Sequence, residues 1–206
     1  MKIISYLIII LLPTFLILLN FRLLIFNRGF YQNQLATLGV YQNFNNRQEV
    51  NEQLENLLNY YCCTESLSTN FFTPLEITHL EDVKSTISLA NFQLAFTTSA
   101  AFILILVLAT KGEFKYLGKS LIRASLATIA AVLILWISYL LNFSFIFDNF
   151  HKIIFKSNLW QLPPESNLIK LFPQQFFVNF ANRIAYQTVI MAALIIIVAQ
   201  ILKGRK

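Results

Sequence analysis

Four long apolar stretches constrain this chain more than any other feature of its sequence. A transmembrane helix needs about 20 predominantly apolar residues to cross the hydrocarbon core of a bilayer. The composition agrees, because 56% of the 206 residues are apolar and only 13% are charged, whereas soluble domains carry about 25% charged residues. The stretches of sufficient length are residues 3–26, 92–110, 121–141 and 184–202. The sequence therefore predicts an all-α membrane protein with four transmembrane helices.

The first stretch follows Lys2, so a secretory signal peptide is the alternative interpretation of it. Its apolar part is much longer than the roughly 7–15 residues of a signal-peptide core, and no A-x-A-like cleavage site follows. We therefore expect this stretch to be a retained transmembrane helix.

The positions of Lys and Arg indicate the orientation of the helices, because short positively charged loops stay in the cytoplasm. The two chain ends and the region of residues 111–123 carry eight Lys or Arg residues and one acid, Glu113. On the other side, eight Lys or Arg residues are accompanied by nine acids. We expect both termini and the 111–120 loop in the cytoplasm. The two outer segments, 27–91 and 142–183, would form a small, mainly helical extracytoplasmic cap.

The net charge of +6 does not predict a nucleic-acid-binding protein. Such a protein needs its Lys and Arg clustered on a soluble face, whereas half of these residues flank the apolar stretches. We expect the positively charged residues to serve association with the bilayer, and we expect no nucleic acid as a partner.

The first outer segment contains two helix signals. Apolar residues recur at helical spacing and predict an amphipathic helix; they are Val50, Leu54, Leu57, Leu58 and Tyr61. Residues 73–76, Thr-Pro-Leu-Glu, combine a capping Thr, a Pro suited to the first helical position and a Glu that completes a capping box. We expect a helix that starts there and runs into the second apolar stretch.

The second outer segment is rich in aromatic side chains, which a solvated loop would not expose. Nine of the 20 Phe residues of the chain lie between Phe143 and Phe180. We expect a helix lying in the outer membrane interface, with an apolar face formed by Phe143, Phe147, Phe150 and Ile154.

The chain has two histidines, and each has an acid three residues away: His79 with Asp82, and His151 with Asp148. Residues three apart share a helix face, so each carboxylate is placed to hold the tautomer of its imidazole, as orienting groups do in catalytic sites. The alternative interpretation is two surface histidines beside unrelated acids.

Metal binding and cysteine chemistry are less well supported. Glu76, His79, Asp82 and His151 are metal-ligating residue types, but no H-E-x-x-H sequence and no zinc-type Cys spacing occur, so we expect no metal. Cys62 and Cys63 are adjacent, which is too constrained for an ordinary disulfide and is the wrong spacing for C-x-x-C. We expect both to be buried apolar residues.

Two motifs resemble those of a known family. THLEDVKSTI at residues 78–87, followed by an apolar stretch, resembles an H-[ML]-x-D-V-K element. FHKIIFKSNLWQLPPESNLIKLFPQQFF at residues 150–177 resembles an F-H-x-x-F-x-N-x-x-W-x-L-x-P element followed by F-P-x-x-F-F. In this order, within a chain of four membrane spans, they resemble the lipoprotein intramolecular transacylase (Lit) family of bacterial inner-membrane proteins.

The resemblance implies an extracytoplasmic site that moves the sn-2 acyl chain of a diacylglyceryl-cysteine lipoprotein to the α-amino group of the same cysteine. The product would be a lyso-form lipoprotein, made without a cofactor. His79 and His151 match the family histidines and would be catalytic, with Asp82 and Asp148 supporting them. The residues expected to stabilise the oxyanion or bind substrate are Lys84, Asn158 and Trp160.

This chemistry suits the side chains available. An α-amino group titrates at about 7.7–8.0 and must be neutral to attack an ester, and imidazole can accept its proton and return one to the departing glycerol oxygen. Two alternatives from other classes remain at this point. One is a non-enzymatic membrane protein that binds or assembles a partner, and the other is a metal-dependent lipid or peptide hydrolase.

Overall fold

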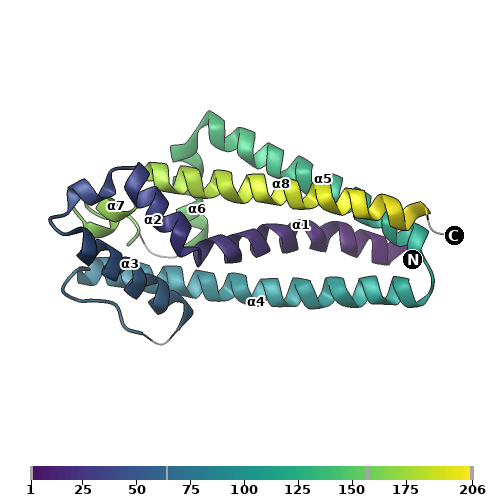
Figure 1. Ribbon diagram of the computed structural model, residues 1–206, viewed down its shortest axis with the longest axis horizontal. Coiled ribbons are helices and arrows are strands. Elements are labelled where there is room, and N and C mark those ends of the chain that lie inside the picture. Colours follow the sequence, from purple (N-terminus) through teal and green to yellow (C-terminus); the bar gives the residue numbers. More distant parts are fainter. Residues whose placement is uncertain (1, 64, 156–157, 205–206) are drawn as a thin grey trace. The chain divides into compact units, whose positions relative to one another are not determined.

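The computed structural model describes residues 2–63, 65–155 and 158–204, and these residues form helices without any strand. In chain order the elements are α1 (Lys2–Ile25), α2 (Arg28–Thr37), the short 3-10 helix η1 (Val40–Asn43), α3 (Arg47–Cys62), α4 (Pro74–Thr110), α5 (Phe114–Leu141), α6 (Phe143–Ile154), α7 (Asn167–Leu171) and α8 (Gln174–Gly204) (Figure 1). Four of them, α1, α4, α5 and α8, are long and apolar enough to cross a membrane. The prediction of an all-α protein with four transmembrane helices is confirmed.

The chain divides into two compact units, which we call the bundle unit and the cap unit. The bundle unit contains Met1–Leu23, Ala90–Leu141 and Asn182–Lys206. The cap unit contains Leu24–Leu89 and Asn142–Ala181. The cap unit therefore has nearly the same residues as the two predicted outer segments.

The bundle unit is held together by small and aliphatic side chains from its four helices. Its buried core consists of Ile8, Leu12, Leu16, Leu108, Leu117, Leu121, Ala124, Ala192 and Ala199. Gly118 lets α5 approach α8 closely, because a Cβ atom at this position would lie 2.6 Å from the carbonyl oxygen of Ala199. Such small-residue contacts are typical of helices that pack in a bilayer.

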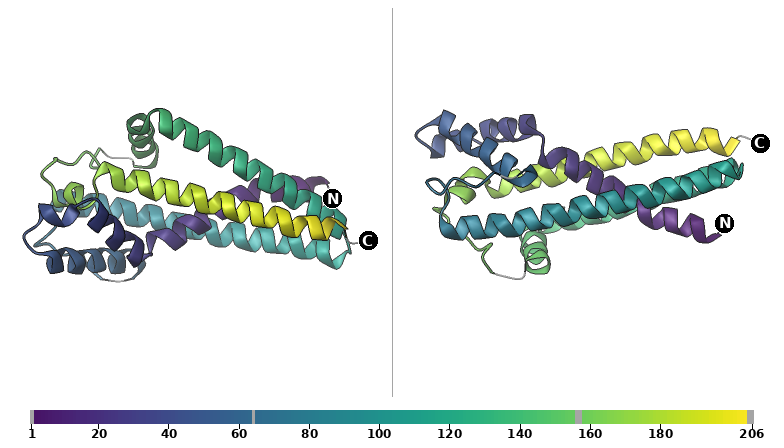
Figure 2. Two further views of the ribbon diagram at one scale, coloured as in Figure 1. Left: turned by 45° about the horizontal axis from the view of Figure 1, so that its top comes forward. Right: turned by 90° about the horizontal axis from the view of Figure 1, so that it is seen from below.

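Within the bundle unit, the start of α1, the turn between α4 and α5, and the end of α8 lie at the same end (Figures 1 and 2). The hydroxyl groups of Ser5 in α1 and Ser120 in α5 are hydrogen-bonded there at 2.8 Å. This arrangement places the start of α1 and the end of α8 beside the positively charged α4–α5 turn; the side of the membrane on which this end lies stays a prediction. Deeper in the unit, the Asn20 amide donates to Leu16 O and to Thr188 Oγ1, so this buried polar side chain is satisfied.

The cap unit has its own core, built on the predicted amphipathic helix α3. Val50, Leu54, Leu57 and Leu58 are buried on one face of α3, which confirms the periodicity seen in the sequence. They pack with aromatic and aliphatic residues of the other cap elements; the largest buried members are Tyr31, Phe71, Phe72, Phe172 and Phe176. The cap unit therefore has a core independent of any bilayer.

Helix α4 begins where the capping box predicts and continues for 37 residues without a break. The Thr73 amide donates to Glu76 Oε2 at 2.7 Å, and the Glu76 amide donates to Thr73 Oγ1 at 3.3 Å. A bilayer requires about 20 residues, so only part of this helix is needed for crossing. The ionisable residues near its start, which include His79 and Lys84, belong to the cap unit.

Only Asn142 separates the end of α5 from the start of α6, and its side chain accepts a hydrogen bond from the Phe145 amide at 3.0 Å. Its exposed apolar side chains are Phe145, Ile146, Phe150, Ile153 and Ile154. The opposite side of the helix carries His151, which is buried. A helix is present where it was predicted, but its predicted apolar face is only partly right: Phe150 and Ile154 are exposed, whereas Phe143 and Phe147 are half-buried and the ring of Phe147 lies against His151. The place of α6 at the membrane interface stays a prediction.

Candidate active site

The two histidines of the chain come together in the cap unit, although 72 residues separate them in sequence. His79 is in the second turn of α4, and His151 is in the last turn of α6. Their ring centroids are 6.3 Å apart, and the ring planes differ by 29°. Each residue is only 8% exposed. The alternative interpretation of two unrelated surface histidines is therefore wrong.

Aromatic side chains surround this histidine pair. Phe155 lies against both rings, with its centroid 5.2 Å from that of His79 and 5.4 Å from that of His151. The rings of Phe147 and Trp160 lie 4.1 Å and 4.8 Å from His151. The pair is thus in a mainly apolar environment, in which hydrogen bonds and charges act more strongly than in water.

The backbone of α6 fixes the orientation of His151. Its Nδ1 atom lies 2.7 Å from the carbonyl oxygen of Phe147, one turn earlier. A carbonyl oxygen can only accept a hydrogen bond, so Nδ1 carries the proton in this arrangement. The lone pair of the neutral ring is then on Nε2, which is the atom available to accept a proton.

Burial favours the neutral form of both rings. It lowers the pKa of His79 from 6.5 to about 4, and the nearby charge of protonated His151 acts in the same direction. Burial also lowers the pKa of His151, although the hydrogen bond to Phe147 partly opposes this effect. Both imidazoles are therefore neutral near pH 7 and able to act as proton acceptors.

Two polar atoms of this site are buried and have no hydrogen-bond partner within the described part of the chain. They are Nδ1 of His79 and Nε1 of Trp160. An indole N–H can only donate a hydrogen bond, and a buried donor without a partner costs free energy. The site therefore holds, next to His151, a donor that a substrate oxygen would satisfy.

The acids predicted to support the histidines influence them through charge. Asp82 raises the pKa of His79 and Asp148 raises that of His151, in each case as a smaller effect than burial. Asp148 is exposed, and the Phe147 carbonyl, not this carboxylate, accepts the hydrogen bond from Nδ1 of His151.

Lys84 and Asn158, which were also predicted as site residues, have interactions outside the histidine pair. The Lys84 ammonium donates to the carbonyl oxygen of Cys63 at 3.2 Å and lies 4.0 Å above the ring of Tyr60. It therefore contacts the end of α3. Asn158 is exposed, and its carbonyl oxygen accepts a hydrogen bond from the Gln161 amide.

The prediction for Cys62 and Cys63 is wrong. The two side chains are exposed and are joined by a disulfide bond. The physical reason is their position at the end of α3: the helix ends at Cys62, and the chain leaves the buried face formed by Val50, Leu54 and Leu57.

The metal ligands considered from the sequence do not form a cluster. In the part of the chain that the structure describes, no three His, Cys, Asp or Glu side chains lie close enough to hold a metal ion. Glu76, one of the four candidates, is 1% exposed and uses its carboxylate for hydrogen bonds to backbone amides.

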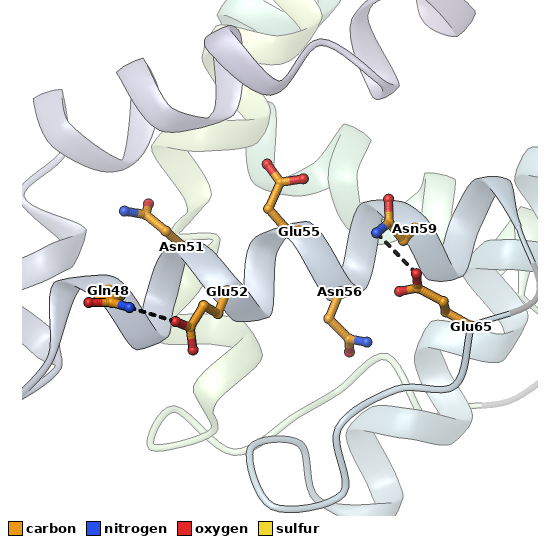
Figure 3. Close-up of a pocket in the computed structure, with 7 residues that line it drawn as sticks. All are labelled: Gln48, Asn51, Glu52, Glu55, Asn56, Asn59 and Glu65. Carbon is orange, nitrogen blue, oxygen red and sulfur yellow. Dashed lines mark hydrogen bonds between the residues drawn. The ribbon is translucent and has the colours of Figure 1, made fainter.

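The polar face of α3 forms a surface pocket that is separate from the histidine pair (Figure 3). It is lined by Gln48, Asn51, Glu52, Glu55, Asn56, Asn59 and Glu65. The side chains bond to one another, as Gln48 does to Glu52 and Asn59 to Glu65. Since these residues include no histidine, the pocket is not the site of imidazole chemistry.

Sequence reasoning missed the residues that shape the surroundings of the histidines. Phe147 and Phe155 lie four residues before and four residues after His151, a spacing that places side chains on one helix face. This spacing was the available signal for Phe147. No sequence signal indicated that Phe155 would also contact His79, because that contact joins two distant segments.

Comparison with known proteins agrees with the fold and with the family resemblance seen in the sequence. The family model "Lipoprotein intramolecular transacylase Lit" matches residues 6–177. An in meso structure of the membrane integral Lit protein from Bacillus cereus has a TM-score of 0.87 at 20% identity, covering 98% of this chain and 94% of that one.

Two further structures of the Bacillus cereus protein, in which a histidine is replaced by arginine or by alanine, each give a TM-score of 0.84 at 19% identity. They cover 98% of this chain and 91% and 92% of theirs. No curated relative matches the chain at a significant level. Because the family model covers most of the sequence, this chain belongs to the lipoprotein intramolecular transacylase Lit family and is a membrane-integral acyl-transferring enzyme.

Proposed function

We propose that this enzyme transfers the sn-2 acyl chain of a diacylglyceryl-cysteine lipoprotein to the α-amino group of the same cysteine, giving a lyso-form lipoprotein. The observation that carries the proposal is the pairing of His79 and His151 at 6.3 Å within an aromatic environment. Such an environment suits a lipid ester, and the paired imidazoles supply the proton transfers that ester-to-amide exchange requires.

His151 is the better supported proton acceptor. With Nδ1 bound to Phe147, its Nε2 lone pair takes a proton from the attacking amine as the new C–N bond forms. The bond between the acyl carbon and the glycerol oxygen then breaks, and that oxygen receives a proton from the histidine pair. Each proton taken up is returned, so neither a covalent enzyme intermediate nor a cofactor is needed.

Nucleophile and ester belong to the same substrate molecule, so orientation supplies much of the acceleration. Effective molarities for well-aligned intramolecular reactions reach about 10⁵–10⁸ M. The main task of the protein is then to hold the lipidated cysteine so that its amine faces the sn-2 carbonyl carbon.

The negative charge of the tetrahedral intermediate needs hydrogen-bond donors. Of the three candidates from the sequence, Trp160 is supported best, because its indole N–H is buried, is unpartnered among the described residues and lies beside His151. Lys84 and Asn158 remain candidates for binding polar groups of the substrate. Asp82 and Asp148 remain supporting residues that act through their charge.

The proposed location follows from the charge pattern and the family. The enzyme would lie in the bacterial cytoplasmic membrane with both termini in the cytoplasm and the cap unit outside. The exposed apolar face of α6, which includes Phe145 and Ile153, would rest in the outer leaflet, so that His151 on its other face meets a membrane-anchored lipoprotein.

Position-specific labelling tests the proposed transfer. A diacylglyceryl lipopeptide carrying an isotope-labelled acyl chain at sn-2 is incubated with the enzyme in vesicles, and its N-terminal peptide is analysed by mass spectrometry. The label should appear on the amine. A matched peptide labelled at sn-1 should keep its label in the ester; label moving from sn-1 to the amine would contradict the proposed regiochemistry.

A further inference from the structure

Glu76 is a buried carboxylate that the proposed mechanism does not use. It lies three residues before His79 and is 1% exposed. Burying a carboxylate is costly unless it is hydrogen-bonded. A capping-box Glu performs its role at a helix start whether or not it is exposed, so capping α4 does not explain why this side chain is buried.

The two carboxylate oxygens of Glu76 have different partners. Oε2 accepts hydrogen bonds from the amide and the hydroxyl of Thr73, at 2.7 and 2.8 Å, and so caps α4. Oε1 accepts a hydrogen bond from the backbone amide of Leu168, 92 residues further along the chain, at 2.7 Å. One side chain thus joins both outer segments.

On the α7 side, Glu76 replaces a local cap. Ser166 has the position of the N-cap residue, but its side chain makes no capping hydrogen bond, and its hydroxyl is buried without a partner among the described residues. The amide of Leu168 is therefore satisfied from the distant helix α4. Without Glu76, this buried backbone donor would lose its acceptor, which carries a free-energy cost.

The hydrogen bond from Leu168 links the stretches that hold the two halves of the site. Glu76 is one turn before His79 on α4. Leu168 is eight residues after Trp160, whose ring contacts His151. The stretch that carries the indole is therefore tied at Leu168 to the helix that carries His79.

We propose that Glu76 is a positioning residue for the transacylation: through Leu168 it sets the placement of Trp160 and His151 relative to His79. This inference rests on the proposed function, because the residues that Glu76 would position are the ones that carry out that reaction. Substrate binding through the acyl chains would be unaffected. Loss of the contact should therefore lower kcat and leave KM nearly unchanged.

Two substitutions separate this role from helix capping. Glu76→Asp keeps a carboxylate that can still cap α4 from the same position, but it is one methylene too short to reach Leu168 as well. Thr73→Val removes the hydroxyl from the capping box and leaves Oε1 of Glu76 free to accept from Leu168. Glu55→Asp is the matched control, because Glu55 is a carboxylate of α3 whose ion pair, at 3.0 Å, is with Arg28 of α2.

Purified variants are assayed with a synthetic diacylglyceryl lipopeptide, and their unfolding temperatures are measured. Glu76→Asp should lower kcat by about 10²-fold, the effect of misplacing reacting groups by about 1 Å, with little change in KM. Thr73→Val should lower the unfolding temperature and keep kcat close to that of the wild type. The control Glu55→Asp should also keep kcat close to that of the wild type. An unchanged kcat in Glu76→Asp, or an equal loss in Thr73→Val, would overturn the inference.

A measurement independent of activity separates failure of this inference from failure of the proposed function. The chain has two tryptophans, so Trp160 is the only tryptophan in a Trp136→Phe background and can be excited selectively over the tyrosines. Adding Glu76→Asp should shift the Trp160 emission to longer wavelength, whereas Thr73→Val should not. An inactive wild-type enzyme would refute the transacylation, yet the same shift would still support the structural link. An unshifted emission would overturn it.

Discussion

Nδ1 of His151 donates a hydrogen bond to the carbonyl oxygen of Phe147 at 2.7 Å, so the backbone of α6 itself selects the tautomer of this ring. In many catalytic sites a carboxylate has this role. A carbonyl orients the ring without adding a full negative charge; its hydrogen bond raises the pKa of His151, but the lowering of the pKa by burial is the larger effect. The arrangement favours an acceptor that is neutral and ready at physiological pH.

The histidines should act as one unit. His79→Ala and His151→Ala are each expected to lower formation of the lyso-form product by about 10²–10⁴-fold, the contribution typical of general acid–base catalysis. The double variant should be barely worse than either single one, because members of a catalytic unit are strongly non-additive. Mass spectrometry of the lipopeptide measures this, with membrane insertion as the control. Near-normal conversion by both single variants would refute the mechanism.

Trp160→Phe tests the oxyanion donor, because it removes the indole N–H and keeps an aromatic ring beside His151. Loss of one such donor costs about 10²–10³-fold in kcat. We expect a decrease of that size with little change in KM, measured by steady-state kinetics. Trp136→Phe is the matched control, since Trp136 is in α5 and donates to Asn182. Equal activity of the two variants would exclude Trp160 as the donor.

The pH dependence of the rate should reflect the substrate amine more than the enzyme. Both histidine pKa values are lowered from 6.5 by burial, that of His79 to about 4, so both rings are mainly neutral at pH 7. The attacking amine becomes neutral only as the pH approaches about 8. The rate should therefore rise from pH 6 to pH 8, as measured with a lipopeptide of known amine pKa. A rate independent of pH in this interval would contradict the assignment.

The pH dependence of folding stability provides a control for this prediction. Its direction follows from the difference in proton binding between the folded and the unfolded chain. The folded-state pKa of His79 is below the unfolded value of 6.5, so the unfolded chain binds more protons as the pH falls. The contribution of neutral His79 to folding stability is fully present above pH 6.5 and is lost as the pH decreases toward about 4. His79→Gln should accordingly flatten the fall in unfolding temperature over this interval.

The two acids should differ in importance. Asp82 is half-buried beside His79, whereas Asp148 is exposed and the Phe147 carbonyl already orients His151. We expect Asp82→Asn to lower kcat clearly, though less than His79→Ala does, and Asp148→Asn to have a smaller effect. Each isosteric change should leave the unfolding temperature nearly unaltered. The opposite order of the two kcat values would show that Asp148 supports the site directly.

Chelation separates acyl transfer by imidazole from metal-dependent hydrolysis. Conversion of the lipopeptide should be the same before and after incubation with EDTA, because the proposed proton transfers use the histidines alone. The measurement is repeated with zinc added back. Activity that disappears with EDTA and returns with zinc would favour the hydrolase alternative.

Local signals in the sequence predicted much of this fold. The four apolar stretches correspond to α1, α4, α5 and α8, and the Thr73–Glu76 capping box correctly located the start of α4. Both depend on residues close together in the chain, where helical periodicity and capping rules apply. The cysteines show the limit of this approach: Cys62 and Cys63 are small apolar residues by type, but a helix end exposes them.

The candidate site was only partly predictable. The histidines stood out because the chain has two of them, each within a motif. Their contact at 6.3 Å, and the rings of Phe155 and Trp160 around them, depend on the packing of segments far apart in sequence. The second partner of Glu76 is a backbone amide. Every residue except proline has such a donor, so no residue type at position 168 could have indicated this contact.

The pairing of the only two histidines in one site has a practical consequence for spectroscopy. A protein labelled with ¹³C at histidine alone would give imidazole resonances from the candidate active site and from nowhere else in the chain. Each tautomer and each protonation step could be followed without assigning the rest of a membrane protein. Because the two rings lie so close together, the titration of one would also be visible in the signal of the other.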